Sequence, residues 1–82
     1  MCNGWTNYET WRIHLEIFDG MTTDEKVDDE YCQQYVEDLL EQESSPSSLV
    51  LSYATAFISK VNWREIAKAI NDISELRLAG VN

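Results

Sequence analysis

The sequence has few of the residues that turn or break a chain, with one proline and three glycines among its 82 residues. Proteins made of many short β-strands place these residues in their turns, so their scarcity favours helices. Hydrophobic residues make up 44% of the chain and aromatic residues 11%, which argues for a folded core rather than disorder. A chain of this length has room for one modest core, so we predict a single helical domain over residues 1–82.

Basic residues are also scarce, because six lysines and arginines stand against fifteen aspartates and glutamates, and the net charge is −9. An acidic surface repels nucleic acids and anionic membranes and attracts basic partners. The chain has no apolar run of about 18 residues that could cross a membrane, and its N-terminus lacks the basic-then-apolar pattern of a secretion signal. We therefore expect a soluble cytoplasmic protein that binds neither nucleic acid nor membrane directly.

Residues that carry catalysis or bind metals are few. His14 is the only histidine, and Cys2 and Cys32 stand at no metal-binding or redox spacing. No recognisable turn places a nucleophile for His14, so a catalytic triad is unsupported. Reduced thiols are the expected state of both cysteines in a cytoplasmic protein. Carboxylates are so frequent that their pairs indicate no acid–base chemistry. We predict no catalytic residue, no metal, no cofactor and therefore no enzyme.

Hydrophobic periodicity predicts four helices that pack as a compact all-α bundle. Their expected ranges are about 7–19, 23–43, 46–60 and 63–78. Each range begins with a start signal of a known kind. The signals are the capping boxes Thr6–Glu9 and Thr22–Glu25, Pro46 after a serine, and Asn62 followed by Glu65.

The core is expected around the aromatic segment Trp5–Trp11, which contains Trp5, Tyr8 and Trp11. Each such side chain can bury roughly 150–250 Å². Trp63 of the last helix is expected to pack against the first helix. The second helix has a single apolar stripe, so it should pack by one side only. That stripe consists of Val27, Tyr31, Cys32, Tyr35, Val36, Leu39 and Leu40.

The third predicted helix differs from the others because it is apolar nearly all round. A helix of this kind either lies at the centre of a bundle or is covered by a second chain. Both arrangements are open, and the second would make the protein a homodimer through this helix. The apolar side chains include Leu49, Val50, Leu51, Tyr53, Phe57 and Ile58.

Acidic residues are concentrated in one segment, since residues 24–43 hold nine of them against one base, Lys26. Like charges four residues apart on a helix destabilise it by roughly 0.2–0.5 kcal/mol, and carboxylates near a helix C-terminus oppose its dipole. These costs favour a binding surface, while a solvated face that only keeps the protein soluble is the alternative. The candidate partner-binding residues are Asp24, Glu25, Asp28, Asp29, Glu30, Glu37, Asp38, Glu41 and Glu43.

On a continuous helix, these acids would form two clusters that resemble a row of phosphates. The clusters would lie about 20 Å apart and span about six phosphates of one DNA strand. Arginines and lysines that grip a DNA backbone also bind carboxylates through charge-assisted hydrogen bonds. The predicted second helix is therefore a candidate DNA mimic.

Two segments carry a family resemblance. Trp5–Trp11 (W-T-N-Y-E-T-W) resembles the W-x-N-Y-E-T-W opening of a family of small proteins carried by phages, plasmids and other mobile elements. Val61–Ala67 (V-N-W-R-E-I-A) resembles the V-N-W-x-E-I-A segment near the end of the same proteins. The resemblance implies no enzymatic activity and transfers no functional residues. The motif residues that we interpret as cap and core are Asn7, Tyr8, Glu9 and Trp11.

The resemblance implies a mobile-element setting, in which short acidic proteins are often anti-restriction or anti-CRISPR factors. The leading expectation is an anti-CRISPR inhibitor in the host-cell cytoplasm. It would cover a basic nucleic-acid-binding surface of a CRISPR effector or of another defence nuclease. The alternative is a non-enzymatic adaptor or regulatory protein of a phage or plasmid that dimerises through its third helix.

Overall fold

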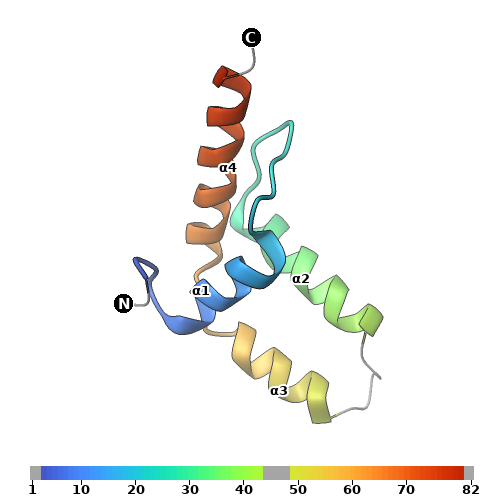
Figure 1. Cartoon of the computed structure of the whole chain (residues 1–82). Coiled ribbons are helices and arrows are strands. Elements are labelled where there is room, and N and C mark those ends of the chain that lie inside the picture. Colours follow the sequence, from blue (N-terminus) through green and yellow to red (C-terminus); the bar gives the residue numbers. More distant parts are fainter. Residues whose placement is uncertain (1–2, 44–48, 81–82) are drawn as a thin grey trace.

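The computed structural model describes residues 3–43 and 49–80, and helices make up most of this chain (Figure 1). The predicted all-α bundle of about four helices is confirmed. The start signal predicted at Pro46 lies outside the described residues. The helices are α1 (Tyr8–Ile13), its π-helical continuation η1 (His14–Phe18), α2 (Asp29–Glu43), α3 (Leu49–Ile58) and α4 (Trp63–Gly80).

The molecule is longer than it is wide, with principal extents of 49 × 28 × 18 Å. In Figure 1, α4 rises toward the C-terminus with the loop between η1 and α2 beside it. α1 and α2 lie around the lower part of α4, and α3 lies at the opposite end of the molecule from the C-terminus. None of the described helices has both the length and the apolar character that a membrane crossing requires.

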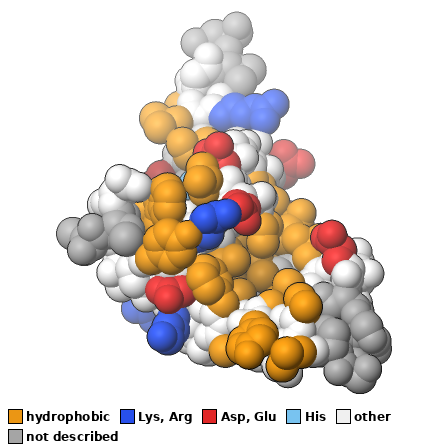
Figure 2. Space-filling view, turned by 60° about the horizontal axis from the view of Figure 1, so that its bottom comes forward, with side chains coloured by type: hydrophobic (Ala, Val, Ile, Leu, Met, Phe, Trp, Pro, Cys, Tyr) orange, Lys and Arg blue, Asp and Glu red, His pale blue; other side chains and the backbone are white. Residues whose placement is uncertain are grey.

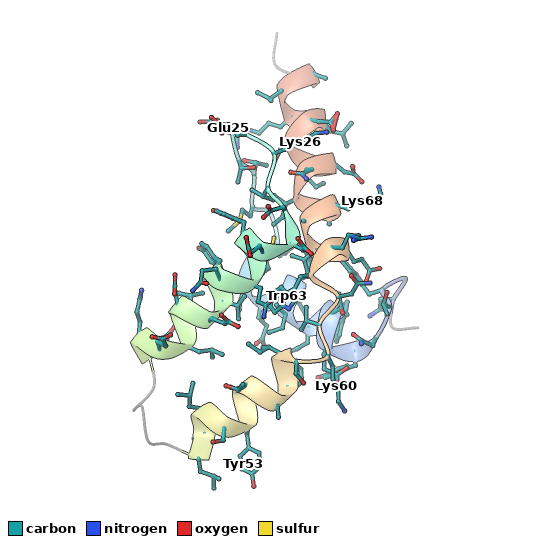
Figure 3. All side chains as sticks on the ribbon, turned by 180° about the vertical axis from the view of Figure 1, so that it is seen from behind. Glu25, Lys26, Tyr53, Lys60, Trp63 and Lys68 are labelled. Atoms are coloured by element: carbon teal, nitrogen blue, oxygen red, sulfur yellow. The ribbon has the colours of Figure 1, made fainter. Side chains whose placement is uncertain are left out.

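The core is centred on Phe18, its largest fully buried side chain, rather than on the segment Trp5–Trp11. That prediction is wrong because Trp5 and Trp11 are only partly buried and Tyr8 is 44% exposed. η1 lies against α4, so the ring of Phe18 at the end of η1 reaches the interior. Trp63 is partly buried and packs against this core (Figure 3). The buried apolar residues are Phe18, Cys32, Val36, Ile58, Val61, Ile66, Ala67 and Ile70.

α1 begins with a cap supplied by Asn7. Its Oδ1 atom accepts from the Thr10 backbone N–H at 2.9 Å and from the Thr10 hydroxyl at 2.6 Å. An asparagine in this position satisfies a free N–H group of the first turn, and the cap role interpreted for Asn7 is confirmed. The predicted capping box of Thr6 with Glu9 is wrong, because the Thr6 N–H donates instead to Glu65 Oε1 of α4 at 3.0 Å.

The two motif segments are hydrogen-bonded to each other. The buried Thr10 hydroxyl accepts from the Asn62 N–H at 2.9 Å, and the Asn7 amide donates to the Lys60 carbonyl at 2.8 Å. Asn62 also caps α4 as predicted, since its Oδ1 accepts from the Glu65 N–H at 3.2 Å. In this protein, the motif residues therefore join the start of α1 to the start of α4.

The second helix begins at Asp29, later than predicted. Its cap is the Asp28 carboxylate, which accepts from the Tyr31 N–H at 2.8 Å. The predicted capping box of Thr22 with Glu25 is wrong, because both residues lie in the loop before the helix. α2 therefore carries only part of the acidic segment.

The loop 21–28 is fastened to α4 by side chains of that helix. Asn71 accepts from the Val27 N–H at 3.0 Å and donates to the Val27 carbonyl at 2.9 Å. The Thr23 N–H donates to the buried Ser74 hydroxyl at 2.9 Å. These bonds satisfy backbone groups that a helix would have paired internally, so tertiary contacts override the local helix signal.

α3 does not lie at the centre of the bundle, so that alternative for the third helix is wrong. It joins the body through the buried Ile58 and the partly buried Phe57. Leu49, Val50 and Tyr53 are 67%, 68% and 68% exposed. Figure 3 shows Tyr53 pointing outward at the end of the molecule. The apolar surface of α3 is thus turned largely to solvent.

Candidate partner-binding surface

The candidate acidic residues lie in two places rather than along one helix. Asp24 and Glu25 are in the loop 21–28, where Figure 3 shows Glu25 beside Lys26 at the end of the loop near α4. The others lie at the start of α2 or within it. The prediction of one continuous acidic helix is therefore wrong for its first part, because residues 21–28 form a loop that runs alongside α4.

At the start of α2, two carboxylates are bonded to the backbone. Asp28 accepts from the Tyr31 N–H, and Asp29 Oδ1 accepts from the Glu30 N–H at 2.9 Å. Both carboxylates lie where the positive end of the helix dipole favours anions. Helix capping thus accounts for these two positions without a binding partner.

Four carboxylates share the side of α2 that lies opposite its buried residues, and we call this side the acidic face. They are Glu30, Glu37, Asp38 and Glu41. At about 100° per residue, the four positions fall within roughly 100° of one another. The opposite side of the helix carries Cys32 and Val36, which are fully buried. Glu43 is exposed at the helix end, but its position lies on the same side of the helix as Val36 and therefore off the acidic face.

Ion pairs of the described residues leave the acidic face unneutralised. They are Arg12–Glu16 and Lys68–Asp72, each with a nitrogen–oxygen distance of 2.7 Å. Hydrogen bonding to these carboxylates raises the pKa of Arg12 and the pKa of Lys68 above their usual values. Both bases are therefore already engaged away from α2.

Neutral glutamines orient two carboxylates of the acidic face. Gln33 Nε2 donates to Glu37 Oε2 at 3.1 Å, and Gln34 Nε2 donates to Asp38 Oδ1 at 2.9 Å. Each glutamine precedes its acid by one helical turn. An amide donor holds a carboxylate in place without cancelling its charge, so the acidic face keeps its negative potential.

A shallow hollow of about 350 Å³ lies between the loop 21–28 and α4. Lys26 and Lys68 both contribute to its lining (Figure 3). Charges of both signs stand close together there, so this side of the molecule offers a partner no uniform potential. The charged lining residues are Lys26, Arg64 and Lys68 with Asp28, Asp29, Asp72 and Glu75.

Two tyrosines that were predicted to face the core are exposed instead. Tyr31 and Tyr35 are 44% and 36% exposed, and they line a groove of about 460 Å³ along α2. Sequence reasoning missed them as site residues, although their spacing of one turn places both on one flank of the helix. The rest of the lining consists of Asp28, Glu30, Gln34 and Asp38.

His14 and Cys32 do not form a chemical site. His14 packs on the Trp5 ring with centroids 4.5 Å apart, and burial lowers the pKa of this histidine. Cys32 is fully buried, and burial raises the pKa of its thiol to about 11. A thiol that stays protonated at neutral pH is a poor nucleophile. Cys2 lies outside the described residues. Within residues 3–43 and 49–80, no cluster of histidine, cysteine and acidic side chains is arranged to hold a metal ion.

No family model, curated protein or solved structure matches this chain. The resemblance of the two motif segments to proteins of mobile elements stays a prediction from the sequence.

Proposed function

We propose that this protein is an anti-defence inhibitor of a mobile element, specifically an anti-CRISPR protein that covers a basic nucleic-acid-binding surface of the effector. The observation that carries the proposal is the acidic face of α2. Its four carboxylates share one side of the helix and take part in no ion pair among the described residues. The two motif segments support the mobile-element setting.

The length of the acidic face suits a short stretch of DNA backbone. Glu30 and Glu41 stand eleven positions apart in the sequence, which corresponds to about 16 Å along an α-helix. Phosphates of one strand are ~3.4 Å apart, so this length matches about five of them. It is shorter than the length expected from an uninterrupted helix over 24–43. Arginines and lysines that hold phosphates would bind these carboxylates through charge-assisted hydrogen bonds.

The acids at the C-terminal end of α2 are expected to destabilise the free protein, which supports a role in binding. Glu37 and Glu41 are like charges four residues apart on the regular part of α2. Glu41 and Glu43 lie in the last turn, which contains no basic residue, although the helix dipole favours cations there. A surface selected only for stability and solubility would place lysines in these positions.

Neutralising the C-terminal acids of α2 tests the proposal. The variant with Glu37→Gln, Asp38→Asn, Glu41→Gln and Glu43→Gln should inhibit at least tenfold less than the wild type. Its free energy of unfolding should rise by about 0.5–1 kcal/mol, because repulsion and an unfavourable dipole contact are removed. Inhibition is measured as the plating efficiency of a targeted phage on cells that carry one of a panel of CRISPR and restriction systems. Stability is measured by urea denaturation.

A charge-matched control separates the position of the acids from the net charge. Substituting Glu9→Gln, Glu16→Gln, Asp19→Asn and Glu75→Gln removes equally many charges outside α2 and should leave inhibition intact. Equal inhibition by the wild type and the α2 variant would show that the acidic face is only a solvated surface and not the binding site. Failure of the wild type to protect the phage from any system in the panel would contradict the anti-defence function.

A second function is favoured by the exposed surface of α3. Leu49–Ile58 contains no acidic or basic residue, and Leu49, Val50 and Tyr53 are exposed. Figure 2 brings this end of the molecule forward and shows hydrophobic side chains gathered on it. Large exposed apolar patches mark interaction sites. The second candidate is therefore a non-enzymatic adaptor or regulatory protein that forms a homodimer through α3.

Analytical ultracentrifugation tests this second candidate by measuring the oligomeric state of the protein. The wild type should show a dimer whose fraction rises with concentration. Tyr53→Lys should give a folded monomer, because a buried lysine would destabilise the interface and the side chain is exposed in the monomer. Leu76→Lys is the matched control, since Leu76 is 70% exposed on α4 away from α3, and it should dimerise like the wild type. A wild type that stays monomeric at millimolar concentration would contradict the dimer.

A further inference from the structure

The groove along α2 combines aromatic rings with carboxylates, and its lining contains no base. Tyr31 and Tyr35 supply the rings, whose centroids are 6.2 Å apart and whose planes differ by 35°. Asp28, Glu30 and Asp38 supply the carboxylates. The groove thus differs from the rest of the acidic face, because exposed ring surface accompanies the negative charge.

The walls of the groove are held in place by contacts beneath and beside them. The Tyr35 ring lies on the fully buried Phe18, with centroids 5.5 Å apart and planes 45° apart. Asp28 is fixed by its bond to the Tyr31 N–H, and Asp38 accepts from a glutamine one turn earlier. Groups that are already positioned lose little conformational freedom when a partner binds.

This lining is complementary to a cation with a flat head and an apolar stem. The face of a tyrosine ring attracts a cation within about 6 Å of its centroid. A guanidinium group is planar, stacks on aromatic rings and donates several hydrogen bonds to carboxylates, whereas an ammonium group is a compact and strongly hydrated charge. Charge and shape therefore favour arginine over lysine, and both over an uncharged side chain.

We infer that the groove of Tyr31 and Tyr35 is a docking site for one arginine side chain of a protein partner. Its guanidinium stacks on the tyrosine rings and is held by the groove carboxylates. The inference rests on the proposed function and specifies it, because the basic surface that the acidic face covers would contribute this arginine. The tyrosines add a contact that charge alone does not provide.

Peptide titration followed by NMR tests the site in the full-length protein. The probes are acetylated Gly-Gly-Arg-Gly-Gly amide and its lysine counterpart. The arginine peptide should shift the ring resonances of Tyr31 and Tyr35 and bind about three- to tenfold more tightly than the lysine peptide. Tyr31→Leu should weaken arginine binding by about three- to tenfold, and Tyr31→Phe should retain it, because phenylalanine keeps the ring.

The matched control is Tyr53→Leu, which removes an exposed tyrosine from α3 and should leave peptide binding unchanged. Circular dichroism establishes that each variant is folded. Equal binding of the two peptides, no binding of either, or an unchanged affinity in Tyr31→Leu would overturn the arginine site. The proposed function would survive such a result if neutralising Glu37, Asp38, Glu41 and Glu43 still abolished inhibition. If that variant also inhibited like the wild type, both the arginine site and the proposed function would be contradicted.

Discussion

Thr10 and Ser74 are the polar side chains that the described part of the chain buries, and both join distant segments. The Thr10 hydroxyl donates to Asn7 and accepts from the Asn62 N–H. The Ser74 hydroxyl accepts from the Thr23 N–H. A buried backbone N–H without such a partner would destabilise the protein by about 1–3 kcal/mol. Small hydroxyl residues therefore fix where segments meet, while apolar residues supply the area that drives them together.

His14 makes the stability of the protein depend on pH. Burial lowers the pKa of His14 below its usual 6.5, and the charge of Asp19 opposes part of that shift. Just below 6.5, the unfolded chain therefore binds a proton that the folded protein does not. The stability that this difference in proton binding contributes is complete above pH 6.5, and it is lost progressively as the pH falls toward the folded-state pKa of His14.

Urea denaturation at about pH 7.5 and about pH 5.5 measures this effect. The midpoint should be lower at the lower pH, because protonating His14 costs more in the folded state. His14→Gln should remove most of the difference, since glutamine does not titrate. An identical pH dependence in the variant would assign the effect to other groups.

At the scale of helices and loops, the attachment of the loop 21–28 to α4 can be tested by mutation. Asn71→Ala removes both hydrogen bonds to Val27 and should lower the free energy of unfolding by about 1–3 kcal/mol. Hydrogen exchange of the Val27 amide should accelerate. Asp72→Ala is the control, because it breaks only the exposed pair with Lys68, a contact of about 0–1 kcal/mol. Unchanged exchange at Val27 would contradict the fastening of the loop.

The same loop shows where prediction from the sequence fails. Helix number and order follow from local periodicity, and that prediction is confirmed. The start of α2 does not follow from it, because the groups that hold the preceding loop lie 44 and 51 positions away in the sequence. Thr22 and Glu25 offer a genuine helix start, but in the folded protein side chains of α4 bind the backbone of this segment instead. Contacts at such distances leave no local pattern.

The candidate site was predictable where α2 is regular. Glu37, Asp38 and Glu41 share one side because their spacing matches the helical turn. Tyr31 and Tyr35 were not predictable as surface residues, because periodicity counts a tyrosine as apolar. A tyrosine can bury one side of its ring and present the other to solvent, as Tyr35 does with Phe18 beneath it.

At the scale of the whole molecule, a net charge of −9 should give salt opposite effects on the free protein and on its complex. Screening acts over ~8 Å at about 0.15 M salt, so it weakens repulsion within the acidic segment. The melting temperature of the free protein should therefore rise with sodium chloride. Binding to a basic effector should weaken over the same range, because the same screening reduces attraction.

Melting curves and effector binding in a salt series measure both effects on one sample. The variant that neutralises Glu37, Asp38, Glu41 and Glu43 is the control, and its response should be smaller in both measurements. A free protein that salt destabilises would show that the like charges do not repel appreciably. A complex insensitive to salt would remove electrostatic attraction as the basis of binding.

The junction between the starts of α1 and α4 also has a consequence for the order of folding. Its hydrogen bonds join residues 52 and 59 positions apart, so a long loop must close before they form. Bundles with mainly local contacts fold in microseconds to milliseconds, and distant contacts slow this process. During synthesis, α1 leaves the ribosome before its partners Asn62 and Glu65, so these hydrogen bonds form only after the start of α4 has emerged. The attachment of α1 to α4 is therefore expected to form late in folding, although α1 itself is synthesised before α4.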